Sequence, residues 1–203
     1  MTTDTTDKKT EMTIHKTVPD DMPKLLAIYE RARTFMAEHG NPRQWGMTHW
    51  PPESLLWEDI HQKRSYVCEL QGEIVGTFCY IYGEDIEPCY RIIDGNWRTG
   101  GPYGVVHRIA SSGTVGGVGT RCIQWAMEQS GHVRIDTHVD NTVMQSLLLK
   151  LGFVRCGIIH VQEDPDPRIA YEWQEGGKEL ADSIQQSRDR VEIMKHYEGV
   201  QKA

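Results

Sequence analysis

The sequence lacks three features that would each point to a different class of protein. It has no apolar run of membrane-spanning length, and its N-terminal segment MTTDTTDKKT lacks the apolar stretch of a signal peptide. Its five cysteines include no CxxC pair, which disfavours both a disulfide framework and a zinc site. A net charge of −7 is the opposite of the basic excess of a nucleic-acid binder. We therefore expect a cytoplasmic protein that binds no metal, no nucleic acid and no membrane.

The composition is that of an ordinary globular protein, with 38% hydrophobic and 25% charged residues in a chain of 203. This length suits one sizeable domain with short appendages. We expect a polar, disordered segment at residues 1–11, one domain at 12–175 and a helical extension at 176–203. The extension carries a narrow apolar stripe, which suits packing either on the parent domain or on a second copy in a homodimer.

Hydrophobic periodicity predicts seven strands and four helices before the C-terminal extension. The predicted strands are residues 12–18, 66–70, 74–82, 103–110, 133–139, 153–160 and 168–173, and the predicted helices are residues 20–39, 53–64, 117–130 and 141–151. This order indicates a single domain of the α/β (α+β) class, built on a mixed sheet.

The stretch 103–122, YGVVHRIASSGTVGGVGTRC, predicts a strand, a Ser/Gly-rich loop and the start of a helix. Such a loop can hold a phosphate, because glycines allow close backbone approach and the first helical turn presents free N–H groups. Glycines at a strand-to-helix turn can also serve chain reversal alone, and these residues leave both interpretations open. A general nucleotide-binding protein is disfavoured, since no GKS/T follows the loop and the first βα unit lacks GxGxxG.

Residues 12–174 resemble the GNAT superfamily of acetyl-CoA-dependent N-acyltransferases. One family motif, Gln/Arg-x-x-Gly-x-Gly/Ala, falls on Thr114 to Gly119, with Thr114 in place of the leading Gln/Arg. A second motif, a strand followed by an Asn-started helix and Gly-Phe, runs from RIDTHVDN to LLLKLGF. The resemblance implies a mixed, mostly antiparallel sheet flanked by helices, and acetyl-CoA as co-substrate.

The resemblance also implies how acetyl-CoA is held between two parallel strands that splay apart. It assigns the diphosphate to the backbone of Gly117, Val118, Gly119 and Thr120, pantetheine contacts to Ile109, Ala110 and Ser111, and a side-chain contact to Asn141. The missing leading Arg/Gln suggests Arg121 as a substitute cation. The implied activity is acetyl transfer to a primary amine of a small molecule or peptide; the alternative is a non-catalytic acyl-CoA-binding or sensor protein.

Catalysis by this family implies a backbone N–H, here of Ile109 or Ala110, that polarises the carbonyl. The family's usual acid, a tyrosine, is replaced by Leu148, which cannot donate a proton. Asp136 and His138 alternate onto one face of their strand, and His138 has the chemistry of a proton acceptor. The alternative is a structural polar face of Arg134, Asp136 and His138, with Arg108 as a partner of Asp136.

Two further expectations concern the rest of the site. By alternation His107 falls with Val105 and Ile109, which favours a histidine satisfied within the core. The residues expected to bind the acceptor amine are Trp45, Trp50, Tyr80, Glu84 and Trp97. For the two loop tryptophans a role in covering the core is an equal alternative, and acidic side chains after a strand are commonly only solvated.

Overall fold

A computed structural model describes residues 11–46, 48–162 and 165–177 of the chain. The strands are β1 (Thr13–Lys16), β2 (Ser65–Leu70), β3 (Glu73–Gly83), β4 (Asp94–Gly95), β5 (Tyr103–Ser111), β6 (His132–His138), β7 (Val154–Ile159) and β8 (Arg168–Gln174). The helices are α1 (Met22–Glu38), α2 (Glu53–His61), α3 (Val118–Ser130) and α4 (Thr142–Lys150), with short 3-10 turns η1 (Pro19–Asp21) and η2 (Pro88–Arg91).

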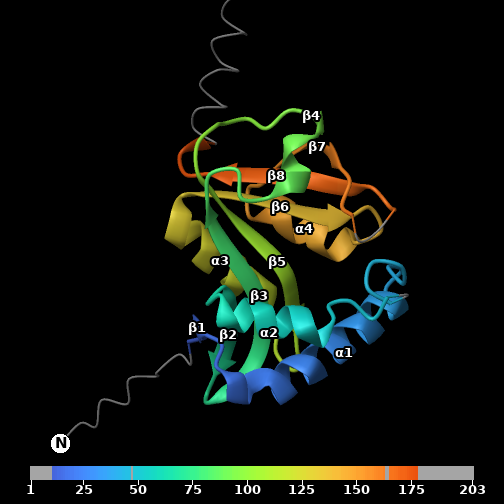
Figure 1. Cartoon of the computed structure of the whole chain (residues 1–203), viewed down its shortest axis with the longest axis vertical. Helices are drawn as coiled ribbons and strands as arrows, with labels where there is room; N and C mark the ends of the chain where they lie inside the picture. Colours follow the sequence, from blue (N-terminus) through green and yellow to red (C-terminus); the bar gives the residue numbers. More distant parts are fainter. Residues whose placement is uncertain (1–10, 47, 163–164, 178–203) are drawn as a thin grey trace, which may run out of the picture.

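All eight strands form one sheet in the order β1-β2-β3-β5-β6-β8-β7-β4. Every neighbouring pair is antiparallel except β5 and β6, which run parallel. Figure 1 shows α1 and α2 in front of the sheet, with α3 and α4 behind it. The sequence prediction of an α/β domain with a mixed, mostly antiparallel sheet flanked by helices is therefore confirmed.

Each face of the sheet buries the apolar stripe of its helices. On one face α3 buries Val118, Cys122, Ile123 and Ala126 against a core that includes Phe78. The other face carries a second core, to which α1 contributes Met22, Leu25, Ile28 and Tyr29 and α2 contributes Leu56 and Ile60. The stripes of these three helices follow the 3.6-residue period on which the sequence prediction of the helices was based.

The parallel pairing of β5 with β6 is short and then ends. The two strands are in register only at Gly104↔Val133 and Val105↔Arg134. Beyond Val105 the neighbour of β5 on its other side, β3, still pairs with it as far as Ser111. The two parallel strands therefore diverge, and among the described residues the β6-facing edge of β5 carries no sheet partner from residue 106 onward.

A β-bulge lies in β5 at the start of this open edge. Thr77 pairs with Ala110 and Cys79 pairs with His107, so two residues of β5 oppose one of β3. Within the bulge Arg108 has a positive φ of 53°, which is unusual for a residue with a side chain. The bulge reverses the alternation of β5, because Val106 and Ile109 pack toward the α3 core while Ala110 packs toward the α1 core.

The elements that the sequence did not predict are all short. Strand β4 has two residues and η1 and η2 have three and four, so none is long enough to show a hydrophobic period. The segment 1–10 and most of the predicted C-terminal helical extension lie outside the described residues, so the proposed domain limits and homodimer stay predictions. Within the described part of the chain, no helix has the length and apolar character to cross a membrane.

Candidate active site

A cavity of about 680 Å³ lies where β5 and β6 diverge. Its floor comes from Val106 to Ile109 of β5 and from Ile135 to Thr137 of β6. Its walls come from the end of α1, the loop before α2, the η2 segment, the start of α4 and the 160–162 segment before β8. The cavity therefore extends from the open edge of β5 to the residues of the α1–α2 loop.

The loop after β5 leads directly into α3. Its N-cap, Gly117, has a φ of 83°, and no side chain caps the helix. Ser111 Oγ and Ser112 Oγ accept the N–H groups of Gly113 and Thr114, at 3.1 and 3.3 Å. The N–H groups of the first helical turn, from Val118 on, have no intrahelical partner by the geometry of a helix. The predicted diphosphate residues thus present an open helix N-terminus.

Two arginines lie near this loop, and they differ in whether the guanidinium is already paired with another group. Arg121 points away from the helix start: its Nε donates to the carbonyl oxygen of Met12 at 3.3 Å, and its Nη1 pairs with Glu128 at 3.2 Å. Arg31 of α1 covers the loop, since a Cβ added to Gly113 would lie 2.7 Å from its Nε. Arg31 makes no hydrogen bond or ion pair within the described residues, so it is the available cation.

The bulge of β5 is held from the α1–α2 side. Tyr29 donates from its hydroxyl to the carbonyl oxygen of Arg108 at 2.9 Å. The Arg108 guanidinium donates twice to Asp59, at 3.0 and 2.7 Å, and Arg64 donates to the other oxygen of that carboxylate at 2.7 Å. The side chain of Asp59 is only 3% exposed. The expected pairing of Arg108 with Asp136 is therefore wrong, because α2 supplies a nearer carboxylate.

Asp136 and His138 do not act together toward the cavity. Asp136 lines it and accepts a hydrogen bond from the Tyr90 hydroxyl at 2.8 Å. His138 is fully buried; its Nε2 lies 3.0 Å from Asp166 and its Nδ1 accepts the N–H of Asp140 at 3.1 Å. Both ring nitrogens are thus engaged in structure, so this geometry supports the structural polar face rather than a catalytic His138.

A different histidine faces the cavity. His107 lines it, and its Nε2 lies 2.7 Å from Oε2 of Glu87, which lines it too. The expectation of a satisfied core histidine missed this exposure to the cavity, because alternation gives the face of a strand on which a residue lies but not whether that face is covered; the bulge separates only Ile109 from this group. The sequence signal for the pair was the group of acidic residues Glu84, Asp85 and Glu87 that follows β3.

The residues expected at the acceptor end divide into two groups. Trp45 and Trp50 line the cavity, and Trp45 also packs edge-on against Tyr29 in the core, at 5.9 Å between ring centroids. For Trp45, lining the cavity and covering the core are therefore compatible roles. The remaining expected residues, Tyr80, Glu84 and Trp97, do not line this cavity.

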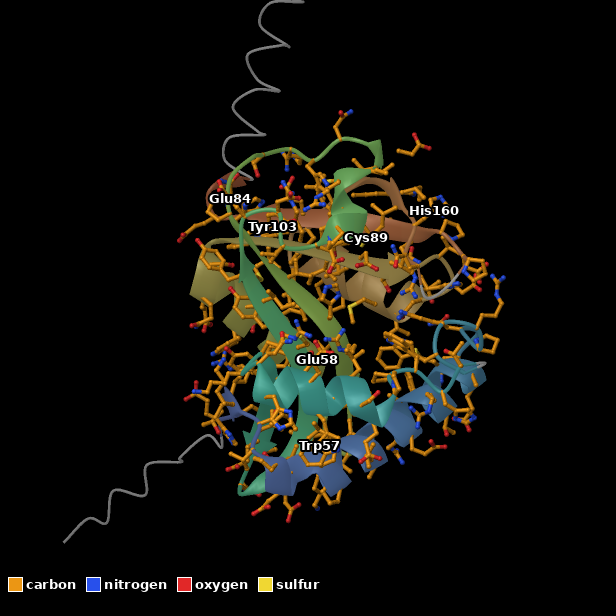
Figure 2. All side chains as sticks on the ribbon, viewed as in Figure 1. Trp57, Glu58, Glu84, Cys89, Tyr103 and His160 are labelled. Carbon is orange, nitrogen blue, oxygen red and sulfur yellow. The ribbon has the colours of Figure 1, made fainter. Side chains whose placement is uncertain are left out.

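Each of those three residues lies elsewhere for a local reason. Tyr80 shares the α3 face of β3 with Phe78, where its ring meets Trp125 at 5.3 Å. Trp97 donates from Nε1 to the carbonyl oxygen of Tyr90 at 2.8 Å, beneath the Arg134 guanidinium. Glu84 lines a separate hollow, and Figure 2 shows it beside Tyr103 and apart from Cys89. The expectation that Tyr80, Glu84 and Trp97 bind the acceptor amine is corrected accordingly, since none of the three lines the cavity.

Four further predicted contacts are placed as follows. Ile109 and Asn141 line the cavity, whereas Ala110 and Ser111 do not. Asn141 caps α4, as the sequence allowed, by accepting the N–H of Met144 at 3.1 Å, and it donates to Gln44 at 3.0 Å. Leu148 is fully buried in the α3 core and does not line the cavity. No metal-ligand cluster occurs among the residues that the structure describes.

Comparison with known proteins agrees with this geometry. A model of the acetyltransferase (GNAT) family matches residues 23–153, which is more than half of the chain. The chain belongs to the GNAT acetyltransferase family. The match spans α1 through α4, and so includes the bulged strand, the Gly-rich loop and most of the cavity lining. Comparison with curated proteins gave no match.

Solved structures of GNAT proteins share the fold. An acetyltransferase of the GNAT family from Streptococcus agalactiae 2603 has a TM-score of 0.73 at 27% identity, over 81% of this chain and 95% of that one. A putative acetyltransferase from Staphylococcus aureus MU50 has a TM-score of 0.58 at 22% identity, over 80% and 98%. A ribosomal-protein-alanine N-acetyltransferase from Brucella melitensis has a TM-score of 0.53 at 17% identity, over 80% and 99%.

Proposed function

We propose that this GNAT protein transfers an acetyl group from acetyl-CoA to a primary amine of a small molecule or peptide. The observation that carries the proposal is the divergence of β5 from β6 beside the cavity. An unpaired strand edge offers backbone N–H and C=O groups at the spacing of a further strand. The pantetheine arm carries two amides, so it fits such an edge.

The helix N-terminus fits the diphosphate of the same co-substrate. An anion there meets the unpaired N–H groups of the first turn and the positive end of the helix dipole. A Cβ added at Gly116 or Gly117 would meet no atom within 4 Å, so the space over the loop is open. Arg31, rather than Arg121, supplies the nearby positive charge.

The bulge serves the chemistry of the transfer. Acyl transfer to an amine requires donors placed where negative charge develops on the carbonyl oxygen. The N–H of Ile109 follows the bulged residue on the open edge, and we assign it that role. Asp59 and Tyr29 hold the bulge from the other side. Since Leu148 is buried and has no proton to donate, the thiolate leaves without an acid at that position.

The test is to incubate the purified protein with acetyl-CoA and n-butylamine, 2-phenylethylamine, spermidine or a peptide with a free N-terminus, and to follow thiol release. We expect amine-dependent release above the rate of acetyl-CoA alone, and an acetylated product by mass spectrometry. Saturable acetyl-CoA binding in calorimetry without turnover of any amine would instead favour a non-catalytic acyl-CoA sensor. The observation that favours this second function is Leu148, which stands where the family usually has a proton-donating tyrosine.

A further inference from the structure

A hydrogen-bonded carboxylate–imidazole pair lies in the cavity wall next to the bulge. His107 immediately precedes the bulged Arg108 on β5, and its Nε2 lies 2.7 Å from Glu87 Oε2. The other oxygen of Glu87 accepts from the Cys89 thiol at 3.2 Å. The side chains of His107 and Glu87 are 20% and 21% exposed, so both are mostly buried yet open to the cavity. Figure 2 shows Cys89 on η2, above α2 in that view.

The pair fixes which nitrogen of His107 carries the proton. Burial by itself raises the pKa of Glu87, but the hydrogen bonds from His107 and Cys89 outweigh it and lower the pKa overall. Glu87 is therefore a carboxylate near neutral pH and accepts the Nε2–H of the imidazole. The lone pair then stays on Nδ1, which has no hydrogen-bond partner within the described part of the chain.

The contrast with His138 makes the assignment specific. His138 accepts a backbone N–H at Nδ1, directs Nε2 to Asp166 and has no exposed surface. His107 has one nitrogen anchored and the other unoccupied in a side chain that lines the cavity. An anchored imidazole with a free lone pair is the arrangement of a proton acceptor.

We propose that His107 accepts the proton of the acceptor ammonium through Nδ1, and that Glu87 is the positioning residue that fixes its tautomer. This proposal rests on the acetyl transfer proposed above. Loss of one proton to His107 leaves a neutral amine, whose lone pair attacks the thioester carbonyl carbon. The C–N bond forms and the C–S bond breaks, and the sulfur leaves with the electron pair. The second amine proton goes to that thiolate, and His107 releases its proton to water.

Other charged groups line the cavity besides His107 and Glu87. Arg64 and Arg108 share the carboxylate of Asp59, and Asp136 lies 3.9 Å from Arg168. His160 also lines the cavity, from the segment between β7 and β8. Among these groups, the described hydrogen bonds to His107 come from Glu87 alone, so Glu87 is the residue whose removal tests the tautomer.

Two substitutions test the pair, and the chain offers a matched control. His15 Nε2 lies 3.1 Å from Glu69 on the exposed edge of the sheet, outside the cavity. With the amine that reacts fastest in the panel, we expect His107→Gln to lower kcat about 100-fold, the scale of a lost acid–base group. Glu87→Gln lowers it about tenfold, the scale of a lost orienting partner. His15→Gln and Glu69→Gln leave it unchanged.

The pH profile separates this role from a structural one. We expect the pH dependence of kcat/KM to differ between the wild type and His107→Gln, because the substitution removes the group that accepts the amine proton. The dissociation constant of CoA, measured by calorimetry, stays within about twofold in both cavity variants, because no phosphate contact is removed. A wild-type kcat and an unaltered pH profile in His107→Gln would overturn the proposal while acetyl transfer itself stands.

A measurement without turnover keeps the test independent of the acceptor. Long-range 1H–15N NMR of the imidazoles reports the tautomer of each histidine, and we expect the Nε2–H form for His107 in the wild type. Glu87→Gln redistributes the two tautomers, whereas Glu69→Gln does not change His107. A His107 that carries its proton on Nδ1 in the wild type overturns the proposal even where no amine of the panel reacts. Failure of CoA to bind at all would instead count against the proposed function.

Discussion

The Arg108 guanidinium donates two hydrogen bonds to Asp59, at 3.0 and 2.7 Å, and so ties the bulge of β5 to helix α2. Arg108 has a backbone conformation that residues with side chains seldom adopt. Its surroundings must therefore hold it, and Tyr29 does so from α1 through the carbonyl oxygen. The α1–α2 side of the sheet thus fixes the backbone from which the N–H of Ile109 projects.

Replacement of Asp59 should lower the free energy of unfolding more than replacement of Tyr29 does. Asp59→Asn leaves Arg108 and Arg64 without their shared charge in a buried position, which we expect to cost about 3–5 kcal/mol. Tyr29→Phe removes one hydrogen bond and should cost about 1 kcal/mol. Urea denaturation measures both. Equal losses for the two variants would show that the Asp59 ion pairs contribute no more than a single hydrogen bond.

The affinity for CoA should depend on Arg31 and not on Arg121. Arg31→Ala removes the guanidinium beside Gly113, which makes no hydrogen bond or ion pair in the described part of the chain, and we expect about fivefold weaker binding, the scale of one exposed charge contact. Arg121→Ala removes a side chain that pairs with Glu128, so the dissociation constant should not change. Calorimetry with CoA and with pantetheine separates the effect, since pantetheine has no phosphate and should bind both variants alike. The opposite ranking would restore Arg121 as the substitute cation.

The N-cap glycine of α3 should tolerate no side chain without strain. Gly117 has a φ of 83° and open space around it, so Gly117→Ala meets no clash but a disfavoured backbone. We expect a loss of about 1–2 kcal/mol in the free energy of unfolding. Gly100→Ala is the matched control, because it also has open space but no positive φ. Equal unfolding midpoints for the two variants would contradict a strain at the helix start.

Much of the fold was predictable because long elements carry their period in the sequence. All seven long strands and all four helices of the described chain were expected, and the Gly-rich loop lies where the glycine pattern placed it. Strand β4 was missed because two residues show no alternation. The parallel pairing of β5 and β6 also followed from the family resemblance rather than from either strand alone.

The site was less predictable because it depends on one extra residue in β5. Strict alternation grouped His107 with Ile109, but the bulge at Arg108 places Ile109 toward the α3 core, and both residues line the cavity. Alternation also placed His138 on the expected face. The sequence of its own strand could not show, however, that the segment after β7 brings Asp166 within hydrogen-bond distance of His138. Bulges and returning loops are tertiary features, so a period of two cannot locate them.

A buried carboxylate on β8 makes the free energy of unfolding decrease at acid pH. Glu172 accepts hydrogen bonds from His132 at 2.7 Å, from the backbone N–H of Arg98 at 2.6 Å and from Arg134 at 3.1 Å. Burial acts to raise its pKa, but these bonds, with one from Thr99, hold the pKa at about 2. The unfolded chain has an ordinary glutamate pKa of about 4.3, so it takes up this proton first as the pH falls.

The sign of the effect follows from that difference. Because the folded pKa is depressed, Glu172 contributes its full stabilisation above about pH 4.3, and this contribution is lost as the pH falls toward 2. Glu172→Gln should therefore lower the free energy of unfolding at pH 7 by about 3–5 kcal/mol, since Arg134 keeps its charge in a buried position. It should also flatten the decline in stability between pH 4.3 and 2. Urea unfolding at pH 7, 4.5 and 3 measures both effects, and a variant whose stability falls with acid as steeply as the wild type would assign that decline to other carboxylates.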